Sequence, residues 1–305
     1  MGLILHAPAK INLYLKVLNQ RHDGYHNIIS LMQMVGLYDT LTFQEESAHI
    51  RLVVKGSDVP SDQSNLVLRA ARMLQKEMEK THRIKQGATI TLEKRIPISA
   101  GLGGGSSDAA CTLMGLNRLW SLRLSRQYLT RLGGYVGSDV PFFFHGPFAW
   151  VFGRGERVQK TASAVSGFIV LVFSGEPVST AKVFHEIGNE IDLTKREHAI
   201  SIKSEAVPSV EKILLHPEND LEKVTLKAQP GLIKVKQLLE SFGGCGALMS
   251  GSGPTVFARF LNESAAESAA LKIRGEGFER VFVAPLLLRA PRGFGVNKDC
   301  FSDSV

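Results

Sequence analysis

Residues 101–107 read GLGGGSS, a run whose residue types suit the binding of a phosphate group. Glycine leaves its backbone N–H accessible and permits positive φ angles, so successive glycines can form a concave anion-binding nest. From Ser107 onward the apolar residues follow helical spacing, and a helix N-terminus adds partial positive charge. The pattern favours a phosphate-binding loop over a flexible turn, which is the structural alternative.

The loop alone does not define the kind of phosphate site. It lacks the GK[ST] ending of a Walker A motif, and Ser106 occupies the last glycine position of GxGxxG.

Three other segments narrow the chemistry. Residues 9–17 alternate as a strand that has one polar face, where Lys10 and Asn12 point the same way, and such a lysine neutralises charge in phosphoryl transfer. Asp139 lies in the segment GSDVPFF, and residues 250–254 form a second glycine-serine loop, SGSGP. Each has a structural alternative: a solvated edge-strand lysine, a helix-cap aspartate and an ordinary hairpin loop.

Regular elements flank these segments, and periodicity predicts their positions. We expect a turn at Asp23-Gly24 and a helix over 65–80 capped by Ser64 or Asp62. The first half should also contain a strand over 88–94, an irregular glycine loop, a helix from Ser107 and a short helix over 127–132 that ends at Gly133-Gly134. The second half should contain strands over 168–173, 247–249, 255–260 and 280–285, and helices over 230–242 and 264–274.

Composition limits the function classes. The chain has 305 residues and is 44% hydrophobic, enough for one large or two modest domains, without the apolar run of about 20 residues that spans a membrane. Three cysteines without metal-ligand spacing indicate reduced thiols and a cytoplasmic location. The N-terminus resembles neither a secretory signal nor a transit peptide. The net charge of +7 is spread along the chain, which favours anionic small substrates over nucleic acid.

Three motifs resemble the signature motifs of the GHMP kinase superfamily and occur in its order: PAKINLYL at 8–15, PISAGLGGGSSDAA at 97–110 and LMSGSGPTVF at 248–257. The segment RHDGYHNIISLMQ at 21–33 resembles the substrate loop of the branch that phosphorylates a cytidine diphosphate-linked methylerythritol. SNLVLRAARML, KRIP and GSDVPFF resemble that branch as well. The resemblance covers most of the chain and thins between about 186 and 228 and in the last dozen residues.

The resemblance implies an α+β fold with two domains and an active site in the cleft between them. Residues 1–158 would form a ribosomal-S5-like, nucleotide-binding domain and residues 159–305 a ferredoxin-like domain, with the last residues either returning to the N-terminal domain or lacking order. The implied reaction moves the γ-phosphoryl of ATP, with Mg²⁺, to the 2-hydroxyl of the cytidine diphosphate-linked methylerythritol in isoprenoid precursor synthesis by the non-mevalonate pathway.

The resemblance also assigns residues. Lys10 and Asp139 match the catalytic pair, and Asn12 the group that holds the acceptor. Tyr25, His26 and Phe184 match the cytidine-binding positions, although a packed loop is the simpler interpretation of Tyr25 and His26 taken alone. The implied ATP-binding residues are Asn65, Leu66, Lys94, Gly101, Leu102, Gly103, Gly104, Gly105, Ser106, Ser107, Gly251 and Ser252. Ser107 is a candidate Mg²⁺ ligand, and Asp108 receives no catalytic role.

Other functions remain open at this point. One alternative is a GHMP kinase acting on homoserine, mevalonate or a sugar, which would have no need of the DGYH segment and Phe184; another is a ligand sensor on the same fold, against which the presence of Lys10 and Asp139 weighs. A dinucleotide-dependent oxidoreductase is disfavoured, because residues 122–127 contain no acid. The sequence implies neither nucleic-acid nor membrane partners, and it leaves open the oligomeric state and whether Asp139 is a true base or a positioning group.

Overall fold

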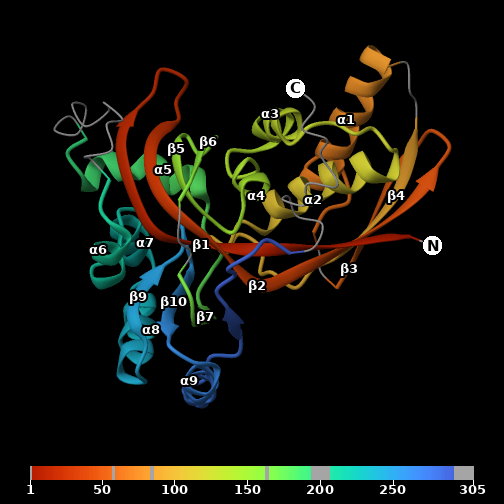
Figure 1. Cartoon of the computed structure of the whole chain (residues 1–305). Coiled ribbons are helices and arrows are strands. Elements are labelled where there is room, and N and C mark those ends of the chain that lie inside the picture. Colours follow the sequence, from red (N-terminus) through yellow and green to blue (C-terminus); the bar gives the residue numbers. More distant parts are fainter. Residues whose placement is uncertain (1, 57–58, 83–85, 162–164, 194–206, 292–305) are drawn as a thin grey trace.

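The computed structural model describes residues 2–56, 59–82, 86–161, 165–193 and 207–291 (Figure 1). Its strands form two sheets, and helices pack against each of them. This mixed arrangement is the α+β fold that the resemblance implied. None of the helices in the described ranges is long and apolar enough to cross a membrane.

The first sheet is built around a long antiparallel hairpin of β1 (Leu3–Gln20) and β2 (His26–Glu46). Its strand order is β3-β4-β2-β1-β8, and β5 and β6 extend it from β2. The further strands are β3 (Ile50–Lys55), β4 (Gly87–Glu93), β5 (Phe148–Gly153), β6 (Arg157–Lys160) and β8 (Glu218–Asn219). Four helices accompany them: α1 (Leu66–His82), α2 (Gly104–Leu119), α3 (Arg126–Val136) and α4 (Phe142–His145).

The second sheet is antiparallel with the order β11-β7-β10-β9. Its strands are β7 (Phe168–Phe173), β9 (Cys245–Met249), β10 (Thr255–Phe260) and β11 (Val281–Pro285). The accompanying helices are α5 (Thr180–Glu190), α6 (Val210–Leu215), α7 (Glu222–Ala228), α8 (Gly231–Ser241) and α9 (Glu263–Gly275). The continuous apolar run of β7 is buried on both faces, as predicted.

The two sheets are connected at two places. β8, from the second half of the chain, pairs with β1 of the first sheet. After β11, Leu286 bridges to Val35, and the amide of Leu287 donates to the Met34 carbonyl at 3.0 Å. The boundary expected at 158/159 falls inside β6, which belongs to the first sheet. Residues 292–305, where the expected tail continues, lie outside the described part of the chain.

Several local predictions are confirmed. A turn forms at Asp23-Gly24, where the Gly24 amide donates to the Arg21 carbonyl at 3.0 Å, and Gly24 has φ +82°. The helix predicted from residue 65 forms, but its cap differs from both candidates. The Asn65 Oδ1 accepts from the Val67 amide at 2.9 Å, while Asp62 binds Ser64 in the preceding turn.

Two local predictions are wrong, and the backbone and packing at glycines explain them. α2 begins at Gly104, not Ser107, because Gly103 (φ +67°) completes the turn and leaves Gly104 and Gly105 helical. α3 continues through Gly133-Gly134 because the missing side chain at Gly133 makes room for neighbours: a Cβ there would lie 2.7 Å from the Val140 Cγ1. The structural alternative of a solvated Lys10 is also excluded, because Lys10 is only 3% exposed.

Candidate active site

Lys10 lies at the centre of the candidate site, on the polar face of β1. Its ammonium is buried, and it donates to the Asn12 Oδ1 at 2.6 Å and to the Gly101 carbonyl at 3.0 Å. The Lys10 amide also donates to the Leu102 carbonyl at 2.9 Å. The prediction that Lys10 and Asn12 share a face is therefore confirmed, and their strand is bonded directly to the glycine loop.

The glycine loop can take its shape because side chains are absent from it. Gly101 has φ +77°, and a Cβ there would lie 1.9 Å from the Ser250 carbonyl oxygen. Gly103 lies so close to Lys10 that a Cβ would be 2.8 Å from the lysine Cγ. The loop therefore passes between β1 and residue 250 and leads directly into α2. Its backbone N–H groups lie next to the N-terminus of that helix, and the two together suit the binding of a phosphate.

Asp139 comes from the turn that precedes α4, and it reaches the same point from the other side. Its Oδ2 lies 3.6 Å from the Lys10 Nζ, with the aspartate side chain 29% exposed and the lysine side chain 4% exposed. Burial lowers the pKa of Lys10, and the nearby Asp139 carboxylate opposes that shift. A buried cation is thus held next to a carboxylate that is accessible to a ligand.

The second glycine-serine loop closes over this pair. Gly251 has φ +56°, and a Cβ there would lie 3.4 Å from both the Asn12 Oδ1 and the Lys10 Nζ. The Ser252 Oγ lies 2.8 Å from the Thr180 Oγ1 at the start of α5. The third motif is therefore part of the same site, brought there by the second sheet.

The residues implied for cytidine binding lie at the tip of the β1–β2 hairpin and on α5. The rings of His26 and Phe184 stack with centroids 5.5 Å apart and an interplanar angle of 28°. Burial lowers the pKa of His26, so its imidazole is neutral at pH 7, and its Nδ1 is buried without a hydrogen-bond partner. Tyr25 is 51% exposed. An aromatic surface with an unused nitrogen atom suits a heterocyclic base.

The residues implied for adenosine binding have structural partners. The Asn65 side chain caps α1, and its Nδ2 donates to the Pro60 carbonyl at 2.8 Å. Leu66 is adjacent to the loop, since a Cβ on Gly105 would lie 3.5 Å from the Leu66 Cδ1. Neither contact tests a role in nucleotide binding, so these assignments stay predictions.

Lys94 forms a buried polar triad with Asp39 and Asp108. Its ammonium binds the Asp39 carboxylate and lies 2.8 Å from the Asp108 Oδ2. Burial would lower the pKa of Lys94, but its neighbours Asp108 and Asp39 outweigh it and raise that pKa, while burial raises the pKa of Asp108 to about 8. The triad lies beneath the start of α2, with the Lys94 Nζ 3.2 Å from the position of a Cβ on Gly104.

This position gives Lys94 a structural task whether or not it also contacts adenosine. The Asp39 Oδ1 accepts from the amides of Arg95 and Ile96 at 2.6 and 2.9 Å. The triad therefore ties the segment that enters the glycine loop to the helix that leaves it. Asp108, which received no role from the sequence, is one of its three members.

Ser107 offers one group to a metal ion. Its Oγ is fully buried and has no hydrogen-bond partner. Among the described residues, no group of three or more His, Cys, Asp or Glu side chains could hold a metal. Mg²⁺ in phosphoryl-transfer sites is bound through one or two protein ligands together with water and phosphate oxygens, so a single hydroxyl beside the loop fits such an ion.

Sequence reasoning missed Asn219 and its neighbours. Asn219 is buried, and its Nδ2 donates to the carbonyls of Met249 and Gly251 at 2.8 and 2.7 Å. The Asp220 Oδ2 accepts from the Val17 amide at 2.9 Å, and the Thr225 Oγ1 donates to the Ser252 carbonyl at 3.1 Å. These contacts hold the third motif against β1. The adjacent polar pair Asn219-Asp220, next to the apolar Leu221, was a signal that could have found them.

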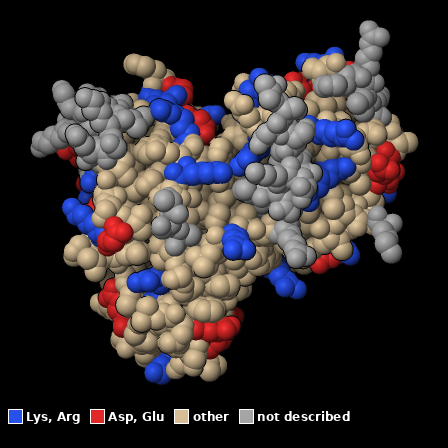
Figure 2. All heavy atoms as spheres, in the orientation of Figure 1, with Lys and Arg blue, Asp and Glu red and all other residues tan. Residues whose placement is uncertain are grey.

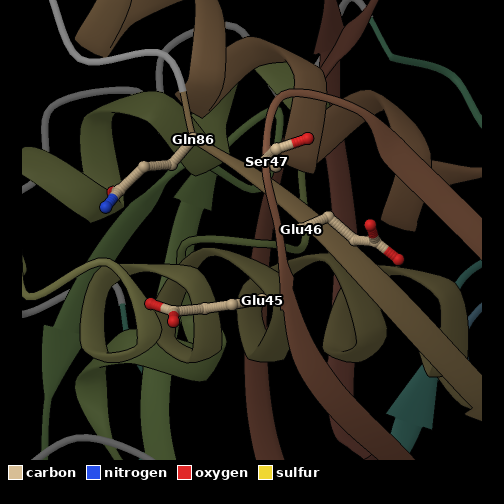
Figure 3. Close-up of a pocket in the computed structure, with 5 residues that line it drawn as sticks. Glu45, Glu46, Ser47 and Gln86 are labelled. Carbon is tan, nitrogen blue, oxygen red and sulfur yellow. The ribbon is translucent and has the colours of Figure 1, made fainter.

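A separate cavity of about 540 Å³ lies at the far end of β2. It is lined by Glu45, Glu46, Ser47, Gln86 and Gly87, and the labelled side chains point in different directions (Figure 3). Two glutamates would repel a phosphate, and none of the residues predicted for the site lies there. The cavity is therefore distinct from the candidate active site.

Comparisons with known proteins agree with this geometry. The model of the GHMP kinases N terminal domain matches residues 65–147, and that of the GHMP kinases C terminal matches residues 202–279. A 4-diphosphocytidyl-2-C-methyl-D-erythritol kinase of Syntrophus aciditrophicus is 44% identical over 277 residues, which cover 90% of this chain and 96% of the relative. One from Exiguobacterium sibiricum is 41% identical over 298 residues, with 94% and 99% covered.

Solved structures give the same picture. A crystal structure of 4-(cytidine 5'-diphospho)-2C-methyl-D-erythritol kinase is 31% identical with a TM-score of 0.74, covering 93% of this chain and 99% of that one. A crystal structure of mevalonate kinase, 17% identical, has a TM-score of 0.67 and covers 95% of this chain and all of that one. The second likeness concerns the fold alone.

Proposed function

This chain belongs to the GHMP kinase family, and we propose that it transfers the γ-phosphoryl group of ATP to the 2-hydroxyl of 4-diphosphocytidyl-2-C-methyl-D-erythritol. The reaction is the kinase step of isoprenoid precursor synthesis by the non-mevalonate pathway. The observation that carries the proposal is the Lys10–Asp139 pair, 3.6 Å apart and bonded through Lys10 to the glycine loop. Relatives of that activity, at 44% and 41% identity, support the choice of acceptor.

The nucleotide side of the reaction uses the loop and α2. Backbone N–H groups of the loop and the N-terminus of α2 would hold the phosphates, because both present partial positive charge. Mg²⁺, held by Ser107 and the phosphates, would neutralise charge on the phosphate oxygens. Lysine and arginine side chains are spread over the face shown in Figure 2, and their positive charge favours the approach of an anionic nucleotide.

The acceptor side uses the pair itself. Asp139 orients the acceptor hydroxyl and takes up its proton, because its carboxylate is accessible and adjacent to a cation. Lys10 stabilises the negative charge on the transferring group, since its ammonium is preoriented by Asn12 and Gly101. Asn12 holds the acceptor, while His26, Phe184 and Tyr25 bind its cytosine.

We also propose a cytoplasmic location, because Cys111 and Cys245 carry free thiols. Cell fractionation with an antibody to the chain tests this placement.

Phosphorus NMR tests the proposed reaction. The protein is incubated with ATP, Mg²⁺ and one acceptor at a time: the cytidyl substrate, mevalonate or homoserine. We expect ADP and a new phosphomonoester resonance with the cytidyl substrate alone, coupled to the carbon that bears the 2-hydroxyl. A phosphomonoester with mevalonate or homoserine, and none with the cytidyl substrate, would overturn the proposal in favour of another member of the family.

A further inference from the structure

Arg154 has no role in the reaction as described so far, yet it lies beside the acceptor hairpin. It occupies the turn between β5 and β6, with its guanidinium Cζ 5.1 Å from the centroid of the Tyr25 ring. Its Nη2 donates to the Gly134 carbonyl in α3 at 3.1 Å. The side chain therefore connects the tip of the β1–β2 hairpin to α3.

The turn that carries Arg154 also contacts the segment of the catalytic aspartate. Gly155 is buried with φ +125°, and a Cβ there would lie 3.0 Å from the Ser138 carbonyl oxygen. Ser138 directly precedes Asp139. Arg154 is consequently one residue away from a close backbone contact with the Asp139 segment, and its guanidinium extends from that contact toward Tyr25.

Arg154 acts on a nearby carboxylate only at a distance: together with Arg21, it helps to lower the pKa of Asp23. Within the described ranges, no acidic group lies at ion-pair distance from its guanidinium. The two neighbouring acids, Asp23 and Glu156, spend their hydrogen bonds on other groups than the Arg154 guanidinium. Asp23 accepts from the Arg21 guanidinium at 3.0 Å and from the Tyr25 amide at 3.2 Å. The Glu156 Oε2 accepts from the backbone amide of Arg154 at 2.8 Å.

An anionic ligand would give this half-buried arginine a direct ion pair, which the described residues do not supply. Arginine presents a planar fork of donors that matches two phosphate oxygens at once, and half-burial strengthens such a bond. With its reacting hydroxyl at Asp139 and its cytosine at His26 and Phe184, the acceptor has to place its diphosphate between these points. Arg154 lies beside this region, since its guanidinium contacts Tyr25 and its neighbour Gly155 contacts Ser138.

We propose that Arg154 is a specificity-determining residue whose guanidinium binds the diphosphate of the acceptor. The proposal rests on the proposed function, because only an acceptor with a diphosphate gives the guanidinium this partner. A kinase whose acceptor is a small alcohol, such as mevalonate or homoserine, has no use for a cation at this position.

A different role for Arg154 would be mechanical: the side chain would brace Tyr25 and α3 without touching a ligand. The two roles are separated by comparing ligands with and without phosphates. The binding of cytidine and of cytidine diphosphate is measured by calorimetry for the wild type, Arg154→Gln, Arg154→Lys and Arg157→Gln. Arg157 is an exposed arginine three residues further along the chain, so its variant controls for a general loss of charge.

We expect Arg154→Gln to lower the affinity for cytidine diphosphate by about 10- to 100-fold, the range of a charge-assisted hydrogen bond. The affinity for cytidine should fall by less than about twofold. Arg154→Lys should lose less, because it keeps the charge, and Arg157→Gln should match the wild type. Raised salt should weaken the binding of the diphosphate in the wild type more than that of cytidine, a readout that needs no variant to fold.

If Arg154→Gln lowers the affinity for both ligands equally, or for neither, the proposed role of Arg154 is overturned. The proposed identity of the acceptor would not be affected by that result. Failure of the wild type to bind cytidine and cytidine diphosphate would contradict the proposed acceptor itself, and the inference about Arg154 would fall with it.

Discussion

The ammonium of Lys10 and the carboxylate of Asp139 lie 3.6 Å apart, although one comes from the first strand and the other from the turn before α4. Lys10 is fixed by Asn12 and Gly101, whereas the Asp139 side chain keeps 29% of its surface exposed. The pair therefore joins a rigid ammonium group to an accessible carboxylate. Each of the following predictions concerns a contact that holds this pair, its loop or its acceptor in place.

Gly101→Ala should damage nucleotide binding. A methyl group at this position requires a left-handed conformation for alanine, which costs about 1–2 kcal/mol, and it collides with the Ser250 carbonyl 1.9 Å away. We expect the dissociation constant for ATP to rise at least about tenfold, since 1.4 kcal/mol corresponds to a factor of ten. Calorimetric titration measures it.

Gly188→Ala is the matched control, because nothing lies within 4 Å of a Cβ at that helical position. It should bind ATP like the wild type and be slightly more stable, by roughly 0.5–1 kcal/mol. Equal ATP affinities for the two alanine variants would contradict the account of the loop.

His26→Phe should weaken the binding of the acceptor without affecting the binding of ATP. Phenylalanine preserves an aromatic partner for Phe184 and removes the buried Nδ1, which has no protein partner. If that nitrogen atom binds the cytosine edge, its loss leaves a polar group of the ligand unpaired, so the KM for the acceptor should rise about tenfold or more. Steady-state kinetics with each substrate varied in turn checks this.

The variant His185→Phe, at the exposed neighbour of Phe184, serves as the control and should leave both KM values unchanged. An unchanged acceptor KM in His26→Phe would show that His26 is a packing residue.

Asn219→Ala should destabilise the chain and loosen the third motif. It removes both donors from the carbonyls of Met249 and Gly251 and leaves them unsatisfied in a buried place. A buried unsatisfied group costs about 1–3 kcal/mol, so urea unfolding should show a loss of at least that size. Asn189→Ala, on the exposed surface of α5, should show almost none. Similar stabilities of the two variants would show that the hydrogen bonds between Asn219 and the third motif do not stabilise the fold.

Much of the fold was predictable because its signals are local. The apolar run of β7 and the Asp23-Gly24 turn each depend on a few adjacent residues, and both appear as predicted. The helix α3 was predicted too short because Gly133 usually marks a helix end, whereas here its lack of a side chain lets Val140 approach. That cause lies in tertiary packing, which periodicity does not contain.

The site was predictable where its residues belong to motifs. The polar face shared by Lys10 and Asn12 followed from alternation in a strand, and the structure confirms it. Asn219 and Arg154 lie outside the motifs, and their contacts are with carbonyls and an aromatic ring that only the fold brings to them. The burial of Lys94 between two aspartates was equally invisible, since Asp39 and Asp108 come from distant segments.

Asp108 should make stability depend on pH. Burial raises its pKa to about 8 from an ordinary value of 3.8, so the folded chain holds a proton that the unfolded chain loses. Its contribution is fully present below about pH 4 and is lost as the pH rises toward about 8. As the pH rises from about 4 to about 8, the free energy of unfolding of the wild type should therefore fall relative to that of Asp108→Asn.

Urea unfolding at a series of pH values measures the difference between the two proteins, and the variant Glu240→Gln, at an exposed position, provides a baseline without this trend. A difference that stays constant from pH 4 to pH 8 would mean that Asp108 remains ionised in the folded chain.

The central claim is that the Lys10–Asp139 pair carries out phosphoryl transfer, and the turnover of Asp139→Asn tests it most directly. Asparagine keeps the size of the side chain but cannot take up the hydroxyl proton, and general base catalysis contributes about 10²- to 10⁴-fold. We predict that kcat with the cytidyl acceptor falls by that factor while the affinity for a non-hydrolysable ATP analogue stays within about twofold of the wild type. A kcat within a few-fold of the wild type would contradict the account and remove Asp139 from the mechanism.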